Sequence, residues 1–250
     1  LARRDGPSGA FADRACANVA RFGDDADVAA AVAFAREACG DDLERNAAIL
    51  RMMLDGRQRA RLPVPAEGGL AEWVRWLLGT AASGTNGPRP SDAVVRVALA
   101  AAATVSAPSL ADVAVGVVRD ADRPLAVRGE AAAVALALDR DRAADAIAER
   151  LMDRQESPAA RVAFAGKIAA LERPAVRAAL DAALASASAA EQRDLAIATI
   201  NGRAGADAVL ALVEHGKVSA RLLQDPQVAR LLGEAGVPDV QARIDRLPAG

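Results

Sequence analysis

One residue type recurs along this chain at a nearly constant interval. Six arginines each open an apolar segment, and the intervals between them are 31, 51, 32, 33 and 32 residues: Arg14, Arg45, Arg96, Arg128, Arg161 and Arg193. A fixed interval of roughly 20 to 50 residues is typical of proteins built from stacked structural repeats. The one long interval contains two Pro/Gly-rich stretches, 57–68 and 80–90, which we interpret as loops that lengthen a single repeat.

The second half of each repeat carries a helical pattern. Apolar residues stand at i, i+3, i+4, i+7 and i+8 in four successive repeats, beginning at Leu70, Leu110, Ala144 and Val176. This spacing places them along one face of an α-helix, and such a face packs on a core. The chain is 52% hydrophobic but only 2% aromatic, and a composition rich in Ala and Leu favours helix over strand. The sequence therefore predicts an all-α fold.

A single helical hairpin cannot bury its apolar face alone, so neighbouring hairpins are expected to stack. We expect six of them, forming a curved right-handed α-solenoid in one domain over 1–250. After Lys217 the pattern changes to shorter helices, which we interpret as a capping element over 218–247. The expected hairpins cover approximately 8–38, 41–79, 91–120, 123–153, 157–186 and 189–216.

Charge and hydropathy exclude two classes of partner. The 31 basic and 33 acidic residues leave a net charge of −2, whereas a general nucleic-acid binder needs a net basic surface. No apolar run reaches the roughly 18 residues of a membrane span, so no transmembrane segment is expected. The chain begins Leu1-Ala-Arg-Arg, without Met or an apolar signal core, which favours a processed piece of a longer protein.

No cofactor, metal or catalytic site is predicted. Cys16 and Cys39 are the only cysteines, and on a hairpin turning near Gly23 their heights differ by roughly 10 Å, too far for a disulfide. We expect two buried, free thiols. His215 is the single histidine; it has no metal-ligand neighbours in the sequence and suits the negative end of a helix. No catalytic nucleophile motif or phosphate loop occurs.

The candidate binding residues lie near the two long loops. Trp73 belongs to the apolar face, whereas Trp76 lies off it and either packs under a loop, the favoured interpretation, or anchors a partner. Arg57, Arg59 and Arg61 either dock an acidic partner or form an ordinary solvated charge run. The six repeated arginines could read a ligand on the concave face, but pairing with an acid of the adjacent repeat is the favoured interpretation.

Several phrases carry a family resemblance. Openings such as Asp92-Ala-Val-Val-Arg-Val-Ala-Leu and Ala159-Ala-Arg-Val-Ala-Phe resemble HEAT repeats. The phrase NAAILRMMLDG at 46–56, and residues 211–232 and 240–247, are similar to the HEAT region of planctomycete-type membrane-bound dehydrogenase or haem-binding proteins. The resemblance implies a position between a quinoprotein-like dehydrogenase propeller and a c-type cytochrome domain. It also implies export from the cytoplasm.

This chain departs from the whole-protein pattern, because it has neither the C-x-x-C-H haem motif nor the propeller. We therefore expect a non-catalytic scaffold for protein domains, by resemblance the segment between the two redox modules. One alternative is a stand-alone HEAT-repeat adaptor that binds a protein on its concave face. A second is a HEAT-fold enzyme of the DNA glycosylase or bilin lyase type, which the charge balance and the few aromatic residues disfavour.

Overall fold

The computed structural model describes residues 7–83 and 89–246. The described residues form α-helices and connecting segments, with no β-strand among them, so the all-α prediction is confirmed. The first six residues, on which the expectation of a processed start rests, lie outside the described part. So do residues 84–88 of the second predicted loop.

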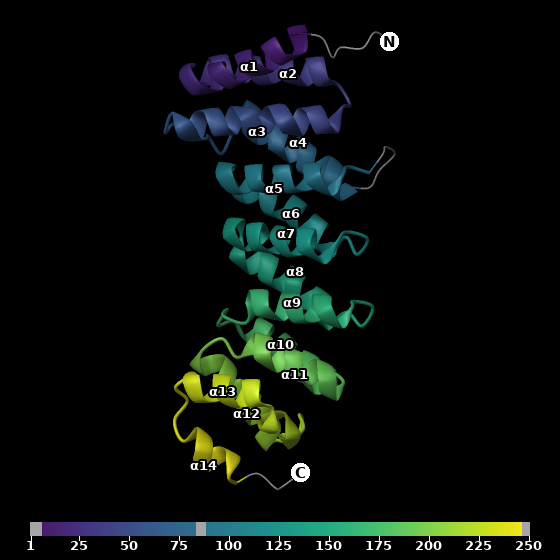
Figure 1. Cartoon of the computed structure of the whole chain (residues 1–250), viewed down its shortest axis with the longest axis vertical. Helices are drawn as coiled ribbons and strands as arrows, with labels where there is room; N and C mark the ends of the chain where they lie inside the picture. The colour runs from purple at the N-terminus through teal and green to yellow at the C-terminus, as the bar shows by residue number, and fades with distance from the viewer. Residues whose placement is uncertain (1–6, 84–88, 247–250) are drawn as a thin grey trace. The chain divides into compact units, whose positions relative to one another are not determined.

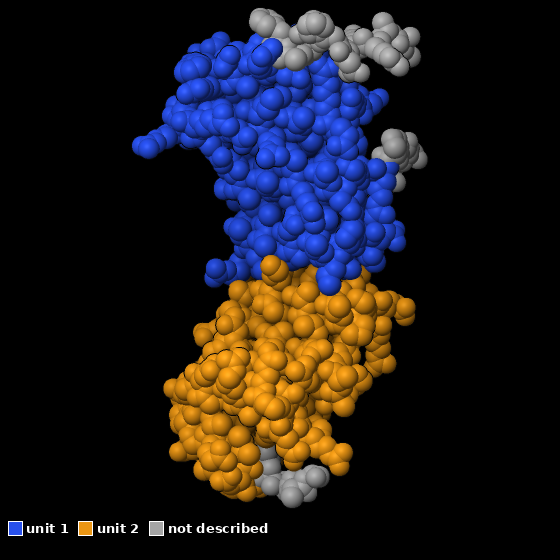
Figure 2. All heavy atoms as spheres, in the orientation of Figure 1, with its two compact units in different colours: residues 1–140 blue, residues 141–250 orange. Residues whose placement is uncertain are grey.

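Contacts within the chain divide it into two compact units, 1–140 and 141–250 (Figure 2). In the first unit α1, α3, α5 and α7 contact one another in order as one layer, and α2, α4 and α6 form a second layer behind it (Figure 1). The helices of this unit are α1 (Pro7–Phe22), α2 (Asp25–Cys39), α3 (Leu43–Arg59), α4 (Gly69–Ser83), α5 (Asp92–Val105), the 3₁₀ turn η1 (Pro108–Leu110), α6 (Ala111–Arg119) and α7 (Leu125–Leu138).

The second unit begins in the first turn of α8 and has its own two layers. In it α9, α11 and α13 contact one another in order, as do α10 and α12. Its elements are α8 (Arg140–Met152), α9 (Pro158–Ile168), α10 (Pro174–Ser186), α11 (Ala189–Thr199), α12 (Arg203–Glu214), the 3₁₀ turn η2 (Ala220–Gln224), α13 (Pro226–Glu234) and α14 (Val240–Ile244). The expected single domain over 1–250 stays a prediction.

The apolar faces read from the sequence form the cores of these units. All five positions of the pattern that starts at Leu70 are buried, including Trp73, whose exposed fraction is 0%. The core position predicted for Trp73 is therefore confirmed. Met152, the last position of the pattern that starts at Ala144, is 40% exposed because α8 ends there.

The predicted loop bounds were too wide. Helix α3 continues through Arg59 and α4 through Ser83, so residues 57–59 and 80–83 are helical. Gly56 lies inside α3, where a Cβ atom would come 2.8 Å from the backbone oxygen of Ala17 in α1. This glycine thus permits a close approach of two helix backbones and does not end the helix.

Candidate functional site

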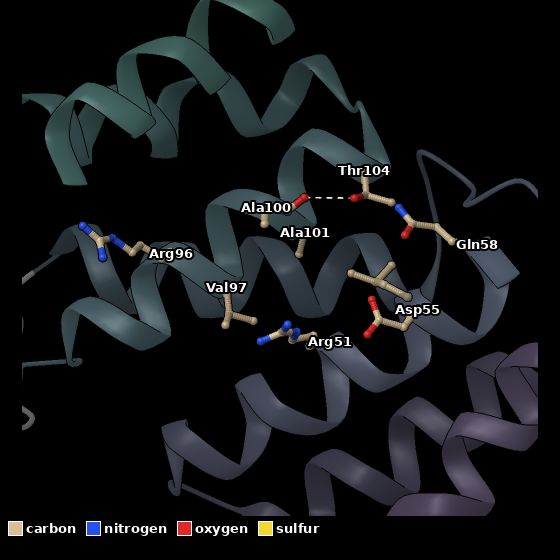
Figure 3. Close-up of a pocket in the computed structure, with 9 residues that line it drawn as sticks. Arg51, Asp55, Gln58, Arg96, Val97, Ala100, Ala101 and Thr104 are labelled. Carbon is tan, nitrogen blue, oxygen red and sulfur yellow. Dashed lines mark hydrogen bonds between the residues drawn. The ribbon is translucent and has the colours of Figure 1, made fainter. Parts of the chain in front are cut away.

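A groove lies between α3 and α5 in the first unit, and we call it the α3/α5 groove (Figure 3). Its cavity volume is about 370 Å³, near the lower end of the range usual for ligand sites. It is lined from α3 by Arg51, Leu54, Asp55 and Gln58, and from α5 by Arg96, Val97, Ala100, Ala101 and Thr104.

The two helices contribute different chemistry to this groove. The floor is apolar, because Leu54 and Ala101 are 5% and 2% exposed. The α5 side consists mainly of short side chains, which leave the space open, whereas α3 presents long polar ones (Figure 3). An apolar floor with a few polar groups at its sides is the usual composition of a binding site.

The polar cross-link between α3 and α5 lies at one end of the groove, whereas ion pairs join the neighbouring helices of the same layer. Between α1 and α3, Arg45 pairs with Asp13 at 3.4 Å, and between α5 and α7, Arg96 pairs with Glu130 at 3.2 Å. At the α3/α5 junction the Ser91 hydroxyl donates to Glu44 at 2.5 Å, at the start of α5. Within the described chain no ion pair or side-chain hydrogen bond spans the groove itself, and a cavity of about 370 Å³ remains between the two helices.

Two charges in the groove have no partner in the described chain. Arg51 and Asp55 stand one helical turn apart on α3, and neither side chain forms an ion pair or hydrogen bond with any described residue. Asp55 is half-buried and Arg51 is exposed. By contrast, Arg96 is engaged by Glu130, and the Thr104 hydroxyl donates to the Ala100 carbonyl at 3.0 Å. Arg51 can therefore donate to an anion and Asp55 can accept from a cation.

The predicted basic cluster does not form one surface. Arg57 is buried, with 4% exposure; its Nε donates to the Pro63 carbonyl at 2.8 Å and its Nη2 pairs with Asp25 at 2.9 Å. It thereby ties the segment after α3 to the start of α2. Arg59 and Arg61 are exposed, and Arg61 has a positive φ of 57°. Only these last two side chains are accessible to a partner.

Trp76 is half-buried, and the side chain of one arginine from a neighbouring helix lies over its ring. The guanidinium carbon of Arg36, from α2, lies 5.0 Å from the ring centroid, a distance typical of a cation–π contact. Trp73, one turn earlier, donates its indole N–H to Asn46 at 3.1 Å in the core. Trp76 therefore has a packing role towards α2, and a partner-binding role for it stays a prediction.

The pairing predicted for the repeated arginines is confirmed for four of them. Arg45 and Arg96 form the pairs given above, Arg161 pairs with Glu191 at 2.5 Å, and Arg193 pairs with Asp225 at 2.6 Å. Arg128 and Arg161 are buried and donate to the carbonyls of Val118 and Leu151, each ten residues earlier and each at 2.9 Å. The arginine at this position thus fastens successive helices.

A second series of cross-links was not foreseen from the sequence. It joins arginines in other positions to acids 31 or 32 residues away: Arg57 to Asp25, Arg89 to Asp120, Arg123 to Asp92, and Arg173 to Asp141. These separations equal one repeat interval. A search for charge pairs one interval apart, instead of for a single repeated residue, would have found them.

The two cysteines and the single histidine lie in surroundings that suit a role in the fold. Cys16 and Cys39 are buried free thiols, as predicted; the Cys16 thiol donates to the Ala31 carbonyl at 3.9 Å, and burial raises the pKa of both thiols. His215 caps the end of α12, with Nδ1 2.6 Å from the Ala211 carbonyl oxygen. Across residues 7–83 and 89–246 no three His, Cys, Asp or Glu side chains are grouped as a metal site would require. Nor is any helix there both long and apolar enough to span a bilayer.

Comparison with known proteins adds no assignment. No protein-family model matches the chain, and no curated protein or solved structure matches it.

Proposed function

We propose that this chain is a non-catalytic HEAT-like scaffold, a solenoid of stacked helix pairs that holds other protein domains. The observation that carries the proposal is the set of polar cross-links between residues 30 to 34 positions apart, which recurs in both units. Each link ties one helix pair to the next. Repeats fastened in this way offer an extended, rigid surface suited to protein binding.

On the family resemblance, we propose that the held domains are a quinoprotein-like dehydrogenase propeller and a c-type cytochrome. The scaffold would keep the electron donor and the acceptor within reach of each other, in a protein exported from the cytoplasm. The chain's own residues would contribute position and no chemistry.

The α3/α5 groove favours a second candidate, a stand-alone adaptor that captures a segment of another protein. Arg51 and Asp55 are unpaired there above an apolar floor. A scaffold whose surface served only to space two covalently linked domains would need no such opening.

The two candidates differ in the size and haem content of the native gene product. An antibody raised against the chain should detect it on a denaturing gel of source-cell extract, and a haem stain of the same gel reports c-type haem, which stays attached through C-x-x-C-H. The linker proposal predicts a haem-positive band well above 25.6 kDa. A haem-negative band at 25.6 kDa would contradict it and leave the adaptor.

A further inference from the structure

We propose that the α3/α5 groove binds an extended peptide segment with an acidic and a basic side chain two residues apart. The inference rests on the proposed function only in taking the ligand to be protein. It specifies which surface binds and which chemistry is recognised there.

The opposite charges of Arg51 and Asp55 call for a ligand that carries one acidic and one basic group. Arg51 is a planar donor that matches a carboxylate in a bidentate manner, and Asp55 accepts from an ammonium or guanidinium group. Both lie beside the buried side chains of Leu54 and Ala101. Because Asp55 is half-buried beside these apolar neighbours, its pair is stronger than a fully exposed one, whereas Arg51 is exposed and its pair is screened by water.

The spacing of Arg51 and Asp55 along the axis of α3 favours an extended ligand. Arg51 and Asp55 are four residues apart on α3, which at 1.5 Å per residue is about 6 Å along the helix. Side chains two apart in an extended peptide lie on one side, about 6.6 Å apart. An acid and a base in an acid-x-base segment therefore match the two groups.

The remaining polar groups of the groove also favour an extended ligand. The short side chains of Val97 and Ala100 leave room for the peptide backbone, and Gln58 and Thr104 lie at the Asp55 end of the groove (Figure 3). The Gln58 amide and the Thr104 oxygen can bond the backbone groups that an extended segment leaves free.

The test is an NMR titration of the ¹⁵N-labelled full chain with capped pentapeptides. The probe is acetyl-Ala-Glu-Ala-Lys-Ala-amide, and the comparison peptides carry Glu-Ala-Glu, Lys-Ala-Lys or Gln-Ala-Gln at the same positions. Amide shifts in α3 and α5 should saturate first with the Glu-Ala-Lys peptide. Losing one ion pair should weaken binding about fivefold, the equivalent of about 1 kcal/mol.

Charge reversal separates recognition from loss of folding. Arg51→Glu makes the groove doubly acidic and should transfer the preference to the Lys-Ala-Lys peptide. Asp55→Lys should transfer it to the Glu-Ala-Glu peptide. The matched control, Arg21→Glu, changes an exposed arginine of α1 outside the groove lining and should leave the preference unchanged.

Other results would overturn the proposal. Absence of shifts in α3 and α5, or equal shifts with all four peptides, excludes recognition of this charge pattern. Equal saturation by free glycine would mean a small zwitterion is the ligand. A dimer in sedimentation that Arg51→Glu dissociates would mean that a second copy occupies the groove. None of these outcomes bears on the size or haem content of the native gene product, which tests the linker proposal separately.

Discussion

Arg57 joins three segments of the first unit, and its role can be measured. Replacing it with Met removes the bonds to Pro63 and Asp25 and should lower the free energy of unfolding by about 1–2 kcal/mol. The loss is limited because the third nitrogen, Nη1, is buried without a hydrogen-bond partner. Arg59→Met changes an exposed side chain and should stay within about 0.5 kcal/mol in the same urea titration. Equal effects of the two variants would contradict the structural role.

Gly56 lies where α3 packs closely against α1, so a side chain at this position should destabilise the fold. Gly56→Ala would place a methyl group 2.8 Å from the Ala17 oxygen, and a backbone oxygen inside a helix cannot move away easily. We expect a loss of about 1–3 kcal/mol in unfolding free energy. Gly129→Ala, in α7, meets no heavy atom within 4 Å and should stabilise the chain by up to about 1 kcal/mol through helix propensity. Opposite signs for two identical substitutions would identify the close approach as the cause.

Between elements, the pair of Arg161 in α9 and Glu191 in α11 is well buried on both sides, with side-chain exposures of 10% and 10%, and it joins successive helix pairs. A double-mutant cycle with Arg161→Met and Glu191→Gln should give a coupling free energy of about 1–3 kcal/mol in urea unfolding. The exposed pair of Arg230 and Glu234 within α13 should give about 0.5 kcal/mol or less. Comparable couplings would mean that the repeat-spaced links do not fasten the helices.

The attachment of α14 should depend on pH. None of its residues is buried, and Arg243 holds it to α12 through Glu214, with both bonds at 2.7 Å, and through Asp207. The hydrogen bonds from Arg243 lower the pKa of the Glu214 carboxyl. The unfolded form therefore binds more protons than the folded form between the two pKa values, so this stabilisation is lost on acidification below about pH 4.

Amide exchange of residues 240–244, corrected for the intrinsic rate at each pH, measures this loss. Protection of α14 should fall below about pH 4 while that of α12 persists. Arg243→Met should remove protection at neutral pH as well. Unchanged protection of α14 in that variant would show that another contact holds the helix.

The helices could be predicted well from the sequence, whereas the α3/α5 groove could not, because helices depend on local patterns and the groove depends on which helices lie side by side. Periodicity in the sequence was enough to predict the apolar face that starts at Leu70. It was also enough to predict that Arg45 and Arg161 each pair with an acid of an adjacent repeat. For a residue such as Gly56, the sequence does not distinguish a glycine that permits close helix packing from one that ends a helix, because the two have the same local signature. Arg51 and Asp55 are ordinary surface charges until α5 is known to lie beside them, so the groove required the tertiary structure.

For the whole molecule, the division into two units gives a prediction that the chain's own fluorophores can test. Both tryptophans, Trp73 and Trp76, lie in α4 of the first unit. Tryptophan fluorescence therefore reports unfolding of residues 1–140, whereas far-ultraviolet circular dichroism reports helices of both units. In repeat proteins each element contacts mainly its neighbours, so destabilisation remains local. Gly56→Ala should lower the urea midpoint seen by fluorescence and shift only part of the dichroism change.

Arg161→Met lies in the second unit and serves as the reciprocal variant. It should shift the other part of the dichroism change and leave the fluorescence midpoint where it is in the parent chain. If both variants instead move the two signals together, the 250 residues unfold in one cooperative transition. In that case the two units are coupled strongly enough to unfold together, and the sequence-based expectation of a single domain is the correct description.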